Sequence, residues 1–159
     1  MENKAGGYAA LPMNPPQIVI DTQVIMDWLV FREPSIAPLV EAVQSGQVAW
    51  IGTPDMKAEL LHVLGRGVAA ERKPDLTAIE EAFAHWCRSI EPAPPKDLRL
   101  ACRDPDDQMF IDLAVSVGAR WLISRDRAVL ALARRANKLC GLTIQKPELW
   151  IKAQLEAQP

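Results

Sequence analysis

The 159-residue sequence lacks the marks of several classes of protein. It has no run of about 18 consecutive apolar residues, and no apolar stretch follows a basic one near its start, so we expect neither a membrane span nor a secretory signal. Its three cysteines are odd in number and form no Cys-x-x-Cys pair, which argues against a disulfide framework and a zinc knuckle. These absences favour a reducing, cytoplasmic compartment.

An excess of positive charge is also missing. Eighteen basic and twenty acidic side chains give a formal net charge of −2, unlike many nucleic-acid binders, so any polyanion must be met by a local basic patch or a metal ion. The sequence contains no glycine-rich phosphate loop, no Gly-x-Ser-x-Gly elbow and no His-Glu-x-x-His motif. Its two histidines, His62 and His85, are isolated, so nucleotide cofactors and zinc chemistry are not indicated.

What the sequence does contain is an alternation of short apolar runs and helical patterns. Residues 1–16 are rich in Gly and Pro and are predicted to be a flexible leader, so that a single domain covers residues 17–159. Strands are predicted at 18–21, 48–52, 121–124 and 142–145, and helices at about 23–30, 36–45, 53–65, 77–86, 104–118, 126–138 and 147–156. This alternation predicts an α/β fold with a mainly parallel sheet covered by helices on both faces.

Acidic residues follow the predicted strands. Asp21 closes the first strand and Asp126 comes shortly after the strand at 121–124, and the carboxyl ends of parallel strands meet at one edge of a sheet. Asp104 and Asp107 flank the start of a helix, and Glu59 lies on the helix after the strand at 48–52. Four or five carboxylates on one rim would repel one another, so we expect Mg²⁺ or Mn²⁺ to bind there.

Each acid also has a purely structural explanation. Asp104 and Asp126 are good helix N-caps, Asp107 suits the first turn of a helix, and Glu59 could lie on a solvated face. Asp21 is the hardest to explain in this way, unless the helix that follows uses it as a cap. The joint placement of the acids, rather than any one of them, therefore favours a metal site.

Three segments stand out in this order: IVIDTQV at residues 18–24, CRDPDDQMFIDLA at 102–114 and WLISRDR at 121–127. Together they resemble PIN-domain proteins, specifically the toxin components of bacterial toxin–antitoxin systems (VapC-like ribonucleases). The resemblance covers about residues 17–150. It implies a compact three-layer α/β/α sandwich and a cytoplasmic endoribonuclease dependent on magnesium or manganese.

The resemblance also implies roles for particular residues. The catalytic acids would be Asp21, Glu59, Asp107 and Asp126, of which Asp21, Asp107 and Asp126 would bind the metal, and the supporting residues would be Asp104, Thr22, Gln23 and Ser124. Gln23 departs from the family, which usually has Asn there. The best candidates to hold RNA phosphates are Arg125, Arg127, Arg134 and Arg135, although an ordinary solvated helix face would explain them equally well. RNA, a cognate antitoxin and further copies of the chain are the expected partners, and no membrane is.

Three other functions stay open on the sequence alone. A catalytically weak PIN scaffold that binds RNA or a partner protein is favoured by Gln23. A HAD-like phosphatase would need a second acid at position 23, and a receiver-type phosphoacceptor would need an acid after the strand at 48–52 and a clear strand-end lysine.

Overall fold

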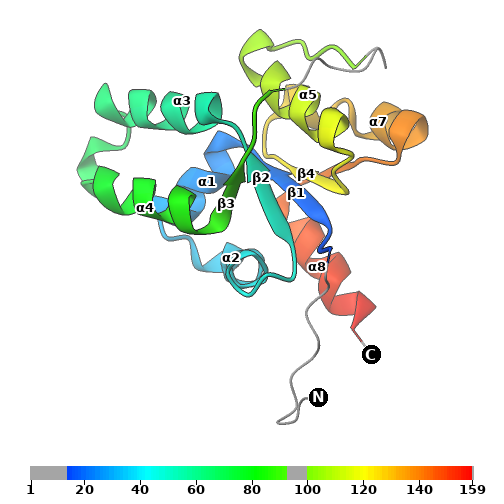
Figure 1. The fold of residues 1–159 in the computed structure, drawn as a ribbon, viewed down its shortest axis with the longest axis horizontal. Helices are drawn as coiled ribbons and strands as arrows, with labels where there is room; N and C mark the ends of the chain where they lie inside the picture. Colours follow the sequence, from blue (N-terminus) through cyan, green and yellow to red (C-terminus); the bar gives the residue numbers. More distant parts are fainter. Residues whose placement is uncertain (1–13, 93–99, 159) are drawn as a thin grey trace.

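The fold is built on one parallel sheet. The computed structural model describes residues 14–92 and 100–158, and its five strands run in the spatial order β3-β2-β1-β4-β5 (Figure 1). All four pairings are parallel, with Ile18 of the central strand opposite Trp50 on one side and Trp121 on the other. The strands are β1 (Gln17–Ile20), β2 (Ala49–Gly52), β3 (Cys87–Ser89), β4 (Trp121–Ile123) and β5 (Thr143–Gln145). The predicted α/β class is confirmed.

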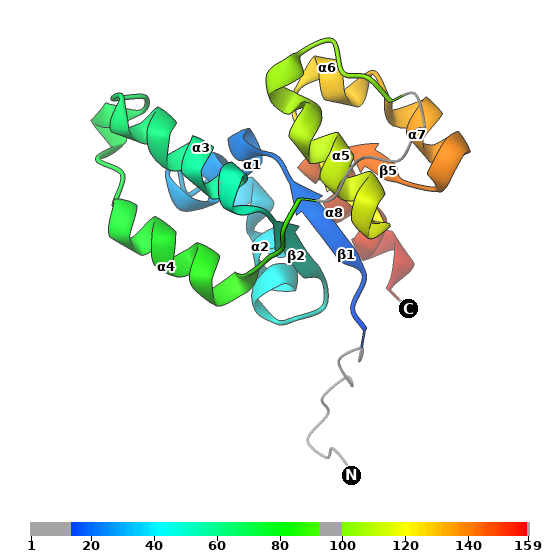
Figure 2. The ribbon, with the colours of Figure 1, turned by 45° about the horizontal axis from the view of Figure 1, so that its top comes forward.

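Helices cover both faces of this sheet and make the three-layer sandwich. Helices α5, α6 and α7 lie over one face and α1, α2 and α8 over the other, while α3 and α4 pair beside the β3 edge (Figures 1 and 2). The α-helices are α1 (Thr22–Leu29), α2 (Ala37–Gln44), α3 (Pro54–Gly65), α4 (Leu76–Trp86), α5 (Gln108–Val117), α6 (Arg127–Leu130), α7 (Ala133–Cys140) and α8 (Pro147–Ala157). Short 3₁₀ turns occupy Pro34–Ile36, Ala70–Arg72 and Pro105–Asp107.

The central position of β1 in the sheet explains why residues 18–20 are all apolar. Side chains alternate between the faces of a strand, so Ile18 and Ile20 join the core under α1, α2 and α8, and Val19 joins the core under α5 to α7. All three are at most 4% exposed. A strand buried on both faces has no position for a polar residue until Asp21, which directly follows it.

Strand β3 was not predicted, and its position explains why. It pairs only with β2, at the edge of the sheet, and Arg88 and Ser89 are exposed, so the segment has no apolar run to mark it. It packs tightly all the same, because a Cβ on Gly52 would come within 2.8 Å of the Cys87 Sγ atom.

Most predicted helix ends are confirmed, and two expectations are wrong. Thr53 caps α3 and the left-handed Gly118 ends α5. The sequence predicts Thr77 as the cap of α4, because Glu80 follows three residues later. The cap is instead Asp75, which accepts from the Ala78 N–H at 3.1 Å, so Thr77 lies inside the first turn. The helix after Asp126 is also not continuous: it is split into α6 and α7 around Leu132.

Some predictions fall on residues outside the described part of the chain. Of the predicted leader, only residues 14–16 are described, where the Pro16 carbonyl accepts from the Ala49 N–H at 2.9 Å. The segment with Pro92, Pro94 and Pro95, which the sequence predicts to be a rigid extended connection before residues 98–101, lies mostly outside the description, because residues 93–99 are not described. Among the described residues, no helix is long and apolar enough to cross a membrane.

Candidate metal centre

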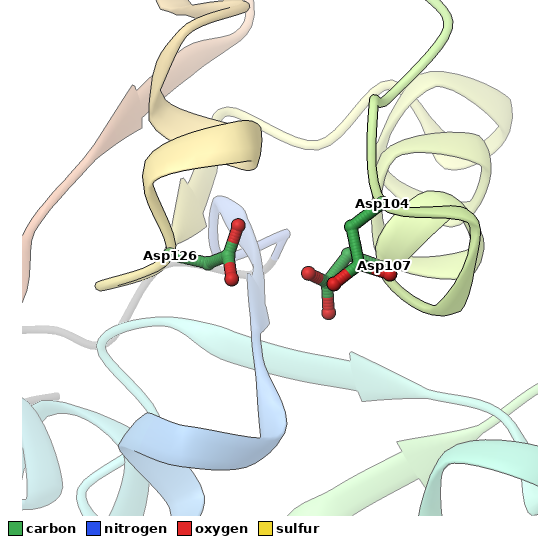
Figure 3. A group of neighbouring side chains, drawn as sticks. All are labelled: Asp104, Asp107 and Asp126. Carbon is green, nitrogen blue, oxygen red and sulfur yellow. The ribbon is translucent and has the colours of Figure 1, made fainter.

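Three aspartates meet above the carboxyl edge of the sheet. Asp104 caps the turn Pro105–Asp107, Asp107 ends that turn directly before α5, and Asp126 caps α6. One carboxylate oxygen from each lies within 4.8 Å of the others, and Figure 3 shows Asp126 facing Asp104 and Asp107 from the opposite side. The expected convergence of acids from separate parts of the sequence is therefore present for these three.

Capping a helix and facing the cluster are compatible for Asp126. The carboxylate accepts from the N–H groups of Ala128 and Val129, at 2.8 and 3.2 Å, and both bonds end on Oδ1. Asp104 likewise uses Oδ1 to accept from the Asp106 N–H at 3.0 Å. The structural and the metal-binding explanations of these acids are thus not exclusive, because each carboxylate has two oxygens.

Asp21 is joined to the cluster through Ser124. Asp21 is 3% exposed and caps α1, where Oδ1 accepts from the Val24 N–H at 3.1 Å. The Ser124 hydroxyl, fully buried, donates to Asp21 Oδ2 and accepts from the Asp126 N–H at 3.0 Å. Asp21 therefore does have the cap role that the sequence left open, and Ser124 connects it to an acid of the cluster. Asp21 is not one of the three grouped acids, so its expected role as a metal ligand stays a prediction, and Asp104, expected as a supporting residue, is the third member of the group.

The acids perturb one another's ionisation. Burial raises the pKa of Asp107 to about 7, together with the negative charges of Asp126, Asp104 and Asp21. Burial also raises the pKa of Asp21 to about 6, against the opposing hydrogen bonds from Ser124 and Val24. Both directions show that negative charge is disfavoured here, and a cation would offset this penalty.

The donors fit a hard divalent cation. The cluster offers only carboxylate oxygens, the ligands that Mg²⁺ and Mn²⁺ prefer, and it contains no imidazole or thiolate, which zinc commonly takes. Magnesium is usually held by only a few carboxylates and keeps several waters, so three acids are a sufficient set. Asp104, Asp107 and Asp126 could hold such an ion.

The structure does not bring every candidate into this group. Glu59 lies on the exposed side of α3 and is outside the three-acid cluster found among the described residues. Thr22 is half-buried and Gln23 is exposed, both in the first turn of α1. The catalytic role of Glu59 and the supporting roles of Thr22 and Gln23 stay predictions.

The four candidate arginines differ from one another. Arg127, Arg134 and Arg135 are exposed on α6 and α7. The guanidinium of Arg125 instead donates to Asp27 from Nε at 2.8 Å and to both carboxylate oxygens of Glu148 at 2.8 and 2.6 Å. RNA contact by all four stays a prediction, and for Arg125 it would compete with these ion pairs.

One further supporting residue, Gln108, was not predicted from the sequence. Its side chain accepts from the Cys102 N–H at 2.6 Å and donates to the Leu100 carbonyl and to Asp112 Oδ1, both at 2.9 Å. These bonds tie the segment that leads to Asp104 onto the first turn of α5. A polar residue at a helix start has many uses, so only the fold could reveal this one.

Comparison with known proteins agrees with this geometry. No curated protein matches the sequence significantly. A family model described as PIN domain matches residues 17–128, more than two thirds of the chain, including β1, β4 and every acid of the cluster. PIN domains are in general metal-dependent nucleases, and an acidic cluster of this kind is what such a nuclease requires. On the match, the parallel sheet and the placement of the acids together, the chain belongs to the PIN-domain family.

Proposed function

We propose that this protein is a Mg²⁺- or Mn²⁺-dependent endoribonuclease that hydrolyses phosphodiester bonds of RNA. The observation that carries the proposal is the convergence of Asp104, Asp107 and Asp126 within 4.8 Å at the strand ends of a PIN domain. A net charge of −2 gives the chain no overall attraction for RNA, so a phosphodiester would have to be met locally, by a cation at these acids and by nearby arginines.

The acids would have different roles according to their positions. Asp104, Asp107 and Asp126 would hold the ion, and Asp21 would act on Asp126 through the Ser124 hydroxyl. When bound, the ion supplies positive charge that stabilises the phosphate oxygens during in-line attack by water. Because the carboxylates of Asp104 and Asp126 are already held by cap hydrogen bonds, these two need little reorganisation to hold the reacting groups in place.

The exposed arginines beside this site would bind the RNA backbone. Arg127 is the first residue of α6, the helix that Asp126 caps, and Arg134 and Arg135 follow on α7. Guanidinium groups pair with phosphate oxygens in a bidentate way, which would orient the strand over the cluster.

A cleavage assay tests the proposal. Single-stranded and structured RNA would be incubated with wild type, Asp107→Asn and Asp106→Asn in Mg²⁺, Mn²⁺ or EDTA. Asp106 is an exposed neighbour in the same turn, so it is a matched control for loss of one charge. We expect cleavage by wild type and Asp106→Asn only with metal, and almost none by Asp107→Asn. Cleavage that persists in EDTA, or that Asp107→Asn retains, would contradict the proposal.

We also propose a biological setting, on the resemblance to toxin components alone. The protein would be the toxin of a toxin–antitoxin pair, cytoplasmic, homo-oligomeric and bound by a cognate antitoxin. Induced expression should then stop growth, Asp126→Asn should not, and co-expression of the neighbouring reading frame should restore growth. Light scattering measures the oligomeric state. Normal growth with active wild-type enzyme would refute the toxin role while leaving the nuclease activity intact.

A second candidate is a PIN scaffold with little catalytic activity that binds RNA or a partner protein. Two observations favour it: Gln23 stands where the resembled family usually has Asn, and Glu59 is exposed and outside the acidic cluster. Such a scaffold would be stabilised by Mg²⁺ through the three aspartates and would cleave no RNA in the same assay.

A further inference from the structure

We propose that Arg125 is a positioning residue, and that its ion pairs with Asp27 and Glu148 make the C-terminal helix α8 part of the support of the metal centre. As far as catalysis is concerned, this inference rests on the proposed function. It assigns a role to a helix that lies beyond the part of the chain matched as a PIN domain, which ends at residue 128.

The backbone on either side of Arg125 belongs to the site. The Ser124 N–H donates to the Gln145 carbonyl at 3.1 Å, and the Ser124 hydroxyl lies between Asp21 and the Asp126 N–H. The backbone N–H of Arg125 also donates to the Asp21 carboxylate. A small shift of residues 124–126 would therefore change the positions of Asp21 and Asp126 relative to each other.

The side chain of Arg125 leaves this backbone and fixes it to two helices. Its Nε donates to Asp27 Oδ2 on α1 at 2.8 Å, and its two terminal nitrogens donate to the two oxygens of Glu148, in the first turn of α8. The side chains of Arg125 and Asp27 are 26% and 17% exposed, so water competes weakly for that pair. The paired arginine lowers the pKa of Glu148, as expected for a carboxylate that stays charged.

This pairing is specific to arginine. A guanidinium can present one edge to Glu148 and the remaining Nε–H to Asp27, whereas a lysine ammonium on a flexible stem cannot hold both in fixed directions. To reach an RNA phosphate, Arg125 would have to give up these bonds. Among residues 14–92 and 100–158, no such ion pair is found for Arg127, which is exposed two residues later, so loss of Arg125 and loss of Arg127 should have different effects.

Three variants and one control test the proposal. Arg125→Met removes both ion pairs, Glu148→Gln weakens one of them, and Arg125→Lys keeps the charge. Glu156→Gln makes the same change as Glu148→Gln at an exposed position of the same helix and is the matched control. The measurements are amide hydrogen exchange in residues 121–128, Mg²⁺ and Mn²⁺ affinity, and unfolding in urea.

We expect faster exchange of the amides at 124–126 and weaker metal binding in the variants that break the pairs. Loss of groups that orient metal ligands typically weakens affinity by about 10–100-fold, and we expect Arg125→Met near the lower end of that range because it acts through the backbone. Arg125→Lys should recover part of the loss, and Glu156→Gln should match wild type. If Arg125→Met does not fold, Glu148→Gln gives the same comparison.

Kinetics separates positioning from RNA contact. Arg125→Met should lower kcat with little change in KM, whereas Arg127→Met should raise KM. The proposal is overturned if Arg125→Met raises KM alone, or if the variants lower stability but exchange and bind metal like Glu156→Gln. Absence of RNA cleavage by wild type would refute the proposed function only, because exchange and metal affinity are measured without RNA. If wild type bound no metal, the exchange comparison alone would decide whether Arg125 positions residues 124–126.

Discussion

Replacing Asp107 by Asn should make the metal-free protein more stable at neutral pH. The pKa of Asp107 is raised from 3.8 to about 7 by burial and by three negative neighbours, whereas in the unfolded chain the carboxyl has its ordinary value. Between these values the folded state binds more protons than the unfolded state, so the free energy of unfolding falls as pH rises through this range. The stability contributed by the protonated group is complete below about pH 4 and lost above about pH 7.

The size of the effect follows from the same shift. Each pKa unit corresponds to about 1.4 kcal/mol, but solvent screens this partly exposed carboxyl, so we expect Asp107→Asn to gain about 1–2 kcal/mol at pH 8 and nothing at pH 4. Asp21, whose pKa is raised to about 6, is retained in the variant, so part of the pH dependence should remain.

Urea unfolding in EDTA at pH 4, 6 and 8, followed by the fluorescence of the five tryptophans, measures this gain. Asp106→Asn, which removes a charge from the same turn, is the control and should gain little. Added magnesium should cancel most of this difference in stability: with a dissociation constant of about 1 mM, a concentration of about 10 mM stabilises wild type by about 1.4 kcal/mol, and Asp107→Asn should lose most of that increment. Equal pH profiles for Asp107→Asn and Asp106→Asn, or equal metal increments, would refute the reasoning.

Three further predictions concern the acids, the basic face and the sheet edge. Asp21→Asn and Asp126→Asn should each remove nearly all RNA cleavage, and the double variant should lose little more, as measured in single-turnover assays. Arg134→Ala should weaken RNA binding and reduce the slope of log affinity against log salt concentration by about 1; an unchanged slope would exclude a phosphate contact. Gly52→Ala should destabilise the protein by about 1–3 kcal/mol, because the new Cβ lies 2.8 Å from Cys87 Sγ. Adding Cys87→Ala should recover much of this loss in urea unfolding, whereas strict additivity of the two changes would argue against the clash.

The sequence was most informative where local pattern and burial agree. The run at residues 18–20 predicted the central strand because both faces of that strand are covered, and Thr53 and Gly118 predicted helix ends because caps depend on nearby backbone. Strand β3 gave no such signal, because an edge strand has one neighbour and partly exposed side chains. In the same way, the spacing of Thr77 and Glu80 predicted the wrong cap for α4, because the helix begins at Leu76 and is capped by Asp75.

The distinction between local pattern and the path of the chain also applies to the candidate site. That acids gather at this edge could be predicted, because the carboxyl ends of parallel strands meet there. The membership of the group could not, because Asp104, expected as a supporting residue, is in it and Asp21, expected as a metal ligand, is outside it. The pairing of Arg125 could not, because Asp27 is 98 residues away and Glu148 is 23 residues away in sequence. Arg125 lies two positions from Arg127, so the sequence alone indicates a basic surface there. Its acidic partners become visible only in the fold.

Because Asp21 both caps α1 and hydrogen-bonds to Ser124, the choice of substitution there determines what an experiment measures. Asparagine is as good an N-cap as aspartate, so Asp21→Asn removes the charge and can keep the start of the helix. Alanine cannot cap, and loses about 1 kcal/mol of helix stability in addition to the carboxylate. A chain that lost its nuclease activity through asparagine at this position would keep its architecture, so the intact fold of a PIN domain is not by itself a sign of an active one.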